Sequence, residues 1–383
     1  MNIKEWEHLE LNRTSNIFPQ RVIKDENIKK EKLSIVYMMV WTKVCGGSKI
    51  ILEYANRLAK KGHKISIVTY DDKPTWFPIS DEINFIQVPE GEEIKKYIPQ
   101  CDLLVATSWK CIYEAVESNK APVAFFEQGG SHLFEAEKLD ERKRQVVEDR
   151  LKLVPFLYTV SQYSSDKIKQ LYGRDSEIIY NALDNNIFYP REEKIKQSEM
   201  TSITIIGSEE FKFKNIEAIL QVIRKLKERY PIQLNWVTQT KPERNKEEAI
   251  INPEQKRIGD ILRNTDIYIC NSEYESFGLP TLEAMTCGAT VITTDTGGMR
   301  DFVQDGKNAL VIQKNDNKDM EEKIELLIKD NKLRQKLAEE GIKTAQRFQW
   351  ENSIEKIEEY YRKIANYQIF NDKDEKEDNN DER

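Results

Sequence analysis

Two acidic side chains stand eight residues apart, on either side of a short segment that joins a predicted strand to a predicted helix. They are Glu275, which lies before the turn, and Glu283, which lies in the first turn of the predicted helix, both in the segment ESFGLPTLEA. Pro280 suits the first helical position, because its missing N–H needs no partner there. The free amides from Gly278 to Leu282 should then favour an anion, and the carboxylates can accept hydrogen bonds from sugar or ribose hydroxyls. The plainer interpretation is that Glu283 complements the helix dipole and Glu275 is a solvated loop residue.

Two further segments have the composition of phosphate-binding loops. Lys214 lies directly before a predicted helix that begins at Asn215, where an ammonium group and a helix N-terminus together would bind a diphosphate. The alternative is a solvated lysine. Gly46 and Gly47 lie between a predicted strand and a predicted helix, where the backbone can approach a phosphate closely, although such a pair is more often a tight bend.

The elements that must position these residues alternate short β-branched runs with longer helical patterns, which is typical of parallel α/β domains. The run LSIVYMMVW is continuously apolar, as a strand buried on both faces requires. Strands of the first half are predicted at residues 33–41, 64–70, 83–88, 102–108, 122–128 and 157–161.

The same order of strand, loop, helix and strand restarts after a charged segment without periodicity, REEKIKQSEM. Strands of the second half are predicted at residues 201–207, 231–238, 266–272 and 289–295, followed by three amphipathic helices. Ligands bind beyond the carboxyl ends of such strands, and two halves side by side would leave a cleft between those ends. We therefore expect the candidate residues to meet there.

Composition and charge exclude several classes of protein. With 39% hydrophobic residues the chain can bury a core, and 59 basic against 66 acidic side chains lack the basic excess of a nucleic-acid binder. The five cysteines form no CxxC pair and the three histidines lack zinc-ligand spacing, so we expect no metal site and a reducing compartment. No apolar run is long enough to span a membrane or resembles a signal peptide, which favours a cytoplasmic protein.

The segment from Glu275 to Ala284, with Gly288 after the helix and Thr296-Gly297-Gly298 after the next strand, resembles the E-x7-E signature of retaining GT-B glycosyltransferases, the large family 4 (group 1) type in particular. The resemblance covers about residues 33–361 and is stronger in the second half. It implies a GT-B fold, in which two Rossmann-like doubly wound α/β domains face each other across a cleft.

The resemblance also implies roles for individual residues. Glu275 would contact hydroxyls of the donor sugar and Glu283 the ribose of the nucleotide, while Lys214 would neutralise the donor diphosphate. Catalytic roles are thus implied for Glu275 and Lys214. The residues implied to bind the donor are Gly46, Gly47, Lys212, Phe277, Gly278, Leu279 and Glu283.

The chain departs from the family pattern at two places. Relatives usually have an Arg where this chain has Ser208, and the loop that follows is one residue longer. Either Lys212 substitutes, or donor binding is weaker, or the chain is a catalytically impaired member. Many relatives also have a histidine of the cleft after the strand that here ends in Glu127 and Gln128, with His132 shortly beyond. These last three residues are candidates for the acceptor side of the cleft, and an ordinary surface or capping histidine is the alternative for His132.

The function implied is transfer of a sugar from a nucleotide-diphosphate sugar to a hydroxyl acceptor with retention of configuration, in glycan or glycoconjugate synthesis. The nucleotide sugar is a substrate, so no cofactor and no metal are expected. The alternatives are a non-catalytic GT-B partner subunit or scaffold, and a GT-B epimerase or phosphorylase, although we find no site that demands the pyridoxal cofactor of a phosphorylase. The acceptor would be a glycan, a lipid-linked sugar or a protein. Contact with the inner membrane face would be at most peripheral.

The expected domains follow from these boundaries, with an N-terminal arm that is a candidate segment for docking a protein partner. They are the arm (1–30), an N-terminal Rossmann-like acceptor domain (31–190), a linker (191–200), a C-terminal Rossmann-like donor domain (201–350), a helix packing back toward the N-terminal domain (351–370) and an acidic disordered tail (371–383).

Overall fold

The computed structural model describes residues 17–27, 30–191, 200–244 and 247–370. The chain divides into two compact units. Unit 1 comprises residues 1–160, 164–179 and 351–383, and unit 2 comprises residues 161–163 and 180–350. Most of the predicted arm and linker, and all of the predicted acidic tail, lie outside the described residues.

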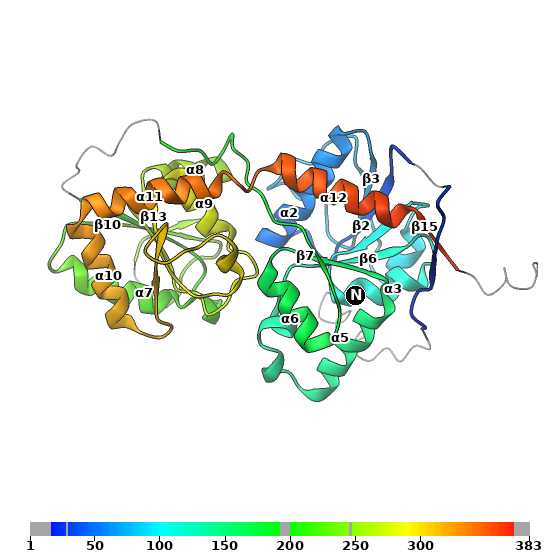
Figure 1. Ribbon diagram of the computed structural model, residues 1–383, viewed down its shortest axis with the longest axis horizontal. Coiled ribbons are helices and arrows are strands. Elements are labelled where there is room, and N and C mark those ends of the chain that lie inside the picture. The colour runs from blue at the N-terminus through cyan, green and yellow to red at the C-terminus, as the bar shows by residue number, and fades with distance from the viewer. Residues whose placement is uncertain (1–16, 28–29, 192–199, 245–246, 371–383) are drawn as a thin grey trace, which may run out of the picture. The chain divides into compact units, whose positions relative to one another are not determined.

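Unit 1 is built on a seven-stranded parallel sheet in the order β4-β3-β2-β5-β6-β7-β8. Its strands are β2 (Ser34–Met38), β3 (Lys64–Thr69), β4 (Asn84–Gln87), β5 (Leu103–Ala106), β6 (Val123–Glu127), β7 (Phe156–Thr159) and β8 (Glu177–Ile178). The central strands are buried on both faces, which explains their continuous apolar sequences. Figure 1 shows α2 and α12 on one face and α3, α5 and α6 on the other.

The helices of unit 1 are α2 (Gly46–Lys60), α3 (Ile112–Glu117), α4 (Ser131–Phe134), α5 (Glu141–Leu153), α6 (Gln162–Tyr172) and α12 (Trp350–Ala365), with short 3-10 turns η1 (Ile94–Tyr97), η2 (Trp109–Cys111) and η3 (Ala136–Lys138). The first residues of α6 and of α12 belong to unit 2.

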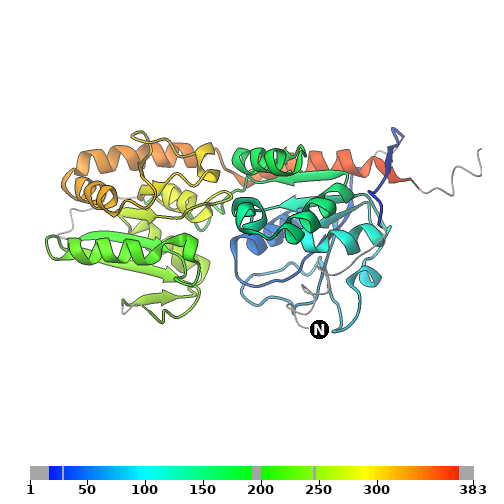
Figure 2. The ribbon, with the colours of Figure 1, turned by 90° about the horizontal axis from the view of Figure 1, so that it is seen from below.

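Unit 2 repeats this plan with a six-stranded parallel sheet in the order β11-β10-β9-β12-β13-β14. Its strands are β9 (Thr201–Ile206), β10 (Ile232–Thr238), β11 (Ala249–Ile251), β12 (Ile267–Cys270), β13 (Thr290–Thr294) and β14 (Ala309–Ile312). The helices are α7 (Ile216–Lys227), α8 (Gln255–Arg263), α9 (Leu279–Cys287), α10 (Asn317–Lys329) and α11 (Asn331–Ala345), with 3-10 turns η4 (Lys212–Lys214) and η5 (Gly298–Asp301). In the view of Figure 2, α7 and α10 cover the face of this sheet opposite to α9 and α11.

Two parallel, doubly wound sheets confirm the predicted fold class. Every strand predicted from the sequence coincides with an observed strand, although each observed strand is shorter. The N-terminal arm differs from expectation. β1 (Val22–Lys24) pairs antiparallel with β15 (Tyr367–Ile369), and the Gln20 side chain donates to Ala121 O and accepts from Val123 N. The described part of residues 17–30 is therefore bonded into unit 1. Among the described residues, no helix has the length and apolar character needed to cross a membrane.

Helix α12 is held on unit 1 by a buried carboxylate. The Glu358 carboxylate contacts the ammonium of Lys61 and accepts from Arg362 Nη2 at 2.6 Å and His63 Nε2 at 3.1 Å. The Leu33 amide donates to His63 Nδ1, which leaves the ring proton on Nε2. Burial would raise the pKa of Glu358, but the hydrogen bonds from these cations and His63 outweigh it and lower the pKa to about 2.

We predict that Glu358→Gln destabilises unit 1 by about 1 to 3 kcal/mol at neutral pH, because the lowered pKa stabilises the fold wherever the unfolded carboxyl is ionised. This contribution is complete above the unfolded pKa and disappears as the pH falls toward 2. Urea unfolding of both proteins between pH 7 and pH 3 measures it. A difference in the free energy of unfolding between wild type and variant that stays constant from pH 7 to pH 3 would contradict the lowered pKa of Glu358.

Candidate functional site

Of the two acidic residues of the predicted signature, Glu275 lies in the connection from β12 to α9 and Glu283 lies in α9 itself. Gly278 precedes α9 with a φ of +91°, and an added Cβ there would lie 2.5 Å from Met299 Cγ. Only glycine fits this turn, because it needs both a left-handed backbone and the space beside Met299. Phe277 is buried and packs on Phe302 and Phe348, so its side chain belongs to the core and only its backbone borders the turn.

Three details of this turn differ from expectation. Leu279 is the first helical residue and Pro280 the second. The amides of Thr281 and Leu282 already donate to Gly278 O, so the row of available amides is shorter than predicted. Glu283 lies in the second turn of α9 and is buried, whereas the sequence placed it in the first turn.

Lys214 and Glu275 meet in the structure although 61 residues separate them. Lys214 Nζ lies 2.5 Å from Glu275 Oε1, and Ser272 Oγ donates to the same carboxylate oxygen at 2.8 Å. Their side chains are 19% and 15% exposed, so the pair borders solvent without being freely hydrated. β9 and β12 are neighbours in the sheet, and the loops at their carboxyl ends bring the two residues together.

The charge of Lys214 is secured by this contact. Burial would lower the pKa of Lys214, but the nearby Glu275 carboxylate outweighs burial and raises the pKa above its ordinary value. The ammonium is therefore charged at neutral pH. Lys214 is the last residue of η4, and Asn215 separates it from α7 with a left-handed backbone. Lys212 is exposed and begins the same 3-10 turn.

An aromatic stack that sequence reasoning missed joins the two loops. The rings of Phe213 and Tyr274 stack at 4.7 Å with planes 16° apart, and each residue directly precedes a member of the ion pair. Lys214 Nζ lies 5.3 Å from the centre of the Phe213 ring. The signal available in the sequence was an aromatic residue directly before each charged candidate.

Ser208, at the position where the family resemblance leads us to expect an Arg, is buried just after β9. Its hydroxyl lies 2.9 Å from Thr240 Oγ1 and accepts from the Glu210 amide. The position is thus part of the packed base of the loop.

The candidates of unit 1 form a second group. Gly46 and Gly47 are the first two residues of α2, whereas the sequence placed them between strand and helix. Gln128 Nε2 donates to Gly47 O at 3.4 Å. Glu127 and His132 are buried and paired, with Nε2 and Oε2 at 2.6 Å, so neither is a surface residue.

Comparison with known proteins gives a family match within unit 2. Residues 190–344 match the family model "Glycosyl transferases group 1". The chain is 32% identical over 108 residues to an uncharacterized glycosyltransferase of Methanocaldococcus jannaschii, covering 28% of this chain and 31% of that one. It is 22% identical to N-acetyl-alpha-D-glucosaminyl L-malate synthase of Bacillus anthracis, covering 82% and 93%. The matched segment spans only 25% to 31% of the first three curated relatives.

A solved structure gives the fold. HepE of Anabaena in complex with UDP-glucose superposes with a TM-score of 0.71 at 16% identity, covering 86% of this chain and 99% of that one. Two doubly wound units, with the group 1 signature in the second, define a GT-B protein. Residues 190–344 match the group 1 glycosyltransferases, which confirms the resemblance seen in the sequence.

We predict that Gly278→Ala lowers the free energy of unfolding of unit 2 by about 2 to 4 kcal/mol, because a left-handed backbone and a clash with Met299 add together. Gly306→Ala is the matched control. Gly306 also has a positive φ, but no atom lies within 4 Å of an added Cβ, so it should lose only about 1 kcal/mol. Equal losses in urea unfolding would show that Met299 moves aside at no cost.

Proposed function

We propose that the protein is a retaining, metal-independent glycosyltransferase that moves a sugar from a nucleotide-diphosphate sugar to a hydroxyl acceptor, in glycan or glycoconjugate synthesis. The observation that carries this proposal is the Lys214–Glu275 pair beside the Gly278 turn. The UDP-glucose complex of the HepE structure supports a nucleotide-sugar donor. A glycan, lipid-linked or protein acceptor and a cytoplasmic location, at most peripheral to the inner membrane face, stay predictions.

The difficult step is departure of the nucleotide diphosphate, which gains negative charge as the glycosidic bond breaks. The Lys214 ammonium would stabilise that charge, and stabilisation by a positioned cation is usually a large part of catalysis. Glu275 would accept hydrogen bonds from sugar hydroxyls. A donor oxygen of the leaving phosphate would take the acceptor proton, so the mechanism needs no protein base.

Donor binding would exchange partners within this pair. The ammonium that now contacts Glu275 would turn toward the diphosphate, and the carboxylate would turn toward the sugar. Because both side chains already lie together and partly buried, little reorganisation is needed. Glu283, buried in α9, would bind the ribose.

Three measurements test the reaction class. The full chain is incubated with a panel of nucleotide sugars, and release of the nucleotide diphosphate is followed with and without acceptors. Proton NMR of the product gives the anomeric configuration, which should equal that of the donor. Activity should survive EDTA. A product with inverted anomeric configuration would refute the retaining mechanism. Loss of activity in EDTA would refute metal independence.

A non-catalytic partner subunit is the second candidate, and Ser208 favours it. A buried serine bonded to Thr240 cannot replace the charge of the arginine that relatives usually have there. Such a scaffold would bind nucleotide sugar weakly and release no nucleotide diphosphate from any donor in the panel.

We predict that Lys214→Ala lowers kcat/KM by about 10- to 150-fold, because a charge-assisted contact contributes roughly 1.5 to 3 kcal/mol. Lys212→Ala is the matched control and should lose less, since Lys212 is exposed in the same turn. Thermal melts of both variants show whether the fold is kept. A larger loss in Lys212→Ala would make Lys212 the main diphosphate ligand.

We predict that alanine substitutions of Glu275 and Glu283 change different kinetic parameters. Glu283→Ala should mainly raise KM for the donor, because a ribose contact exists in ground and transition states alike. Glu275→Ala should mainly lower kcat, because sugar contacts strengthen as the bond breaks. Steady-state kinetics with the best donor of the panel measures both. Wild-type activity in both variants would refute the proposed site.

A further inference from the structure

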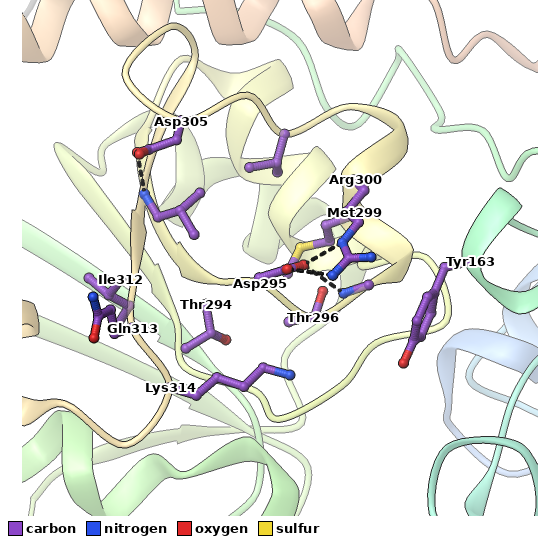
Figure 3. A pocket seen from close by; sticks show the side chains of 13 residues that line it. Tyr163, Thr294, Asp295, Thr296, Met299, Arg300, Asp305, Ile312, Gln313 and Lys314 are labelled. Atoms are coloured by element: carbon purple, nitrogen blue, oxygen red, sulfur yellow. Dashed lines mark hydrogen bonds and ion pairs between the residues drawn. The ribbon is translucent and has the colours of Figure 1, made fainter. Parts of the chain in front are cut away.

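Unit 2 contains a pocket at the carboxyl ends of β13 and β14 that no role above uses. Its volume is about 660 Å³, within the usual range for small-molecule sites. Figure 3 shows the Tyr163 ring on one side of the pocket, Ile312 and Gln313 on the other, and the Asp295–Arg300 pair between them.

The charges around the pocket balance. Asp295 and Asp305 contribute two carboxylates, and Arg300 and Lys314 contribute two cations. Arg300 Nε and Nη2 donate to the two oxygens of Asp295 at 2.8 and 2.6 Å, which neutralises both groups. Lys314 Nζ donates to Glu273 O at 2.6 Å, which uses one of its three protons. A phosphate or nucleotide would meet no net positive charge here, whereas a neutral polar ligand would meet both donors and acceptors.

One polar group in the wall lacks a partner. The Thr296 side chain is only 1% exposed, and its hydroxyl oxygen has no hydrogen-bond partner among the residues that the structure describes. Buried hydroxyls are normally bonded, because an unmade hydrogen bond costs free energy. A ligand hydroxyl is the kind of partner that would satisfy it.

An aromatic side chain, Tyr163, also lines the pocket. The Tyr163 ring packs so closely on the backbone of Gly297 that an added Cβ would lie 2.4 Å from the ring. Sugar rings stack on tyrosine because their C–H groups pack on an apolar surface while their hydroxyls reach polar side chains at its edge. The Arg300 guanidinium lies 5.8 Å from the centre of the Tyr163 ring, where it could donate a hydrogen bond to a sugar hydroxyl.

We propose that this pocket binds a neutral carbohydrate unit, of one or two sugar rings, separately from the nucleotide diphosphate of the donor. The wall of the pocket is shared with the Glu275 segment. The Glu275 amide donates to Thr296 O at 3.2 Å, and the Gly298 amide donates to Glu275 O at 3.1 Å. A sugar held at Thr296 would therefore rest on the backbone that holds Glu275. The inference goes beyond the proposed function, since binding of free sugar is measured without donor.

Saturation-transfer NMR on the full chain tests the proposal, with glucose, galactose, N-acetylglucosamine, maltose, lactose and chitobiose as probes. At least one probe should bind, and its affinity should fall about tenfold in Tyr163→Ala and in Lys314→Ala. Lys318→Ala is the matched control, since Lys318 is 86% exposed in α10 and is not part of the pocket wall. The Lys318→Ala variant should bind the sugar with the affinity of the wild type.

Thr296→Val gives a second readout that a purely structural residue would not produce. Removing an unpartnered hydroxyl from a buried site should raise the melting temperature of the free protein by about 2 °C while weakening sugar binding. Thr290→Val is the control, because its buried hydroxyl donates to Arg334 O at 2.7 Å and its loss should lower the melting temperature.

Several outcomes would overturn the proposal. Absence of binding by every probe would do so, as would binding that Tyr163→Ala and Lys314→Ala leave unchanged. Displacement of the bound sugar by UDP-glucose but not by UDP would show that the pocket houses the donor's own sugar. Displacement by inorganic phosphate would show an anion site. Continued binding in the presence of either nucleotide or phosphate supports a separate carbohydrate subsite.

Discussion

The site of unit 2 depends on one contact, the ion pair between Lys214 and Glu275. It exists because β9 and β12 are adjacent in the parallel sheet, which brings the loops at their carboxyl ends together. The apolar strands fix this adjacency, since Ile203, Ile205 and Ile269 are buried in their centre. A partly buried ion pair adds little to stability compared with an apolar pair of the same volume. The stability of unit 2 therefore rests on its apolar core and not on this pair.

The backbone of the α9 connection matters as much as its side chains. Gly278 takes a left-handed conformation against Met299, and Phe277 anchors the turn by packing on Phe302 and Phe348. The core thus holds the first amides of the helix in a fixed direction. A buried aromatic anchor and a glycine that no other residue can replace together explain why a short segment carries a recognisable signature.

The sequence predicted the strands well because strands buried on both faces have continuous apolar runs that few other elements share. It placed the ends of the α9 and α7 connections less accurately. Pro280 can occupy the first or the second helical position, and nothing local distinguishes the two. The roles of Lys214 and Glu275 followed from family resemblance, but their ion pair was not predicted, because 61 residues separate its members. The Phe213–Tyr274 stack and the pairing of β1 with β15 were missed, since both join residues far apart through contacts that no periodicity encodes.

Unit 1 is assembled from both ends of the described chain, and this has a consequence for its synthesis. The hydroxyls of Tyr37 and Tyr361, 324 residues apart, lie 3.2 Å from each other in the buried layer beneath α12. A ribosome therefore releases all of unit 2 before the last helix of unit 1 exists. Until α12 is synthesised, the part of the unit 1 sheet that it covers stays exposed to solvent, where it can bind chaperones or aggregate. Unit 2 can therefore fold before unit 1 is complete. Docking of α12 on unit 1 closes the longest loop of the chain and becomes the late step of folding.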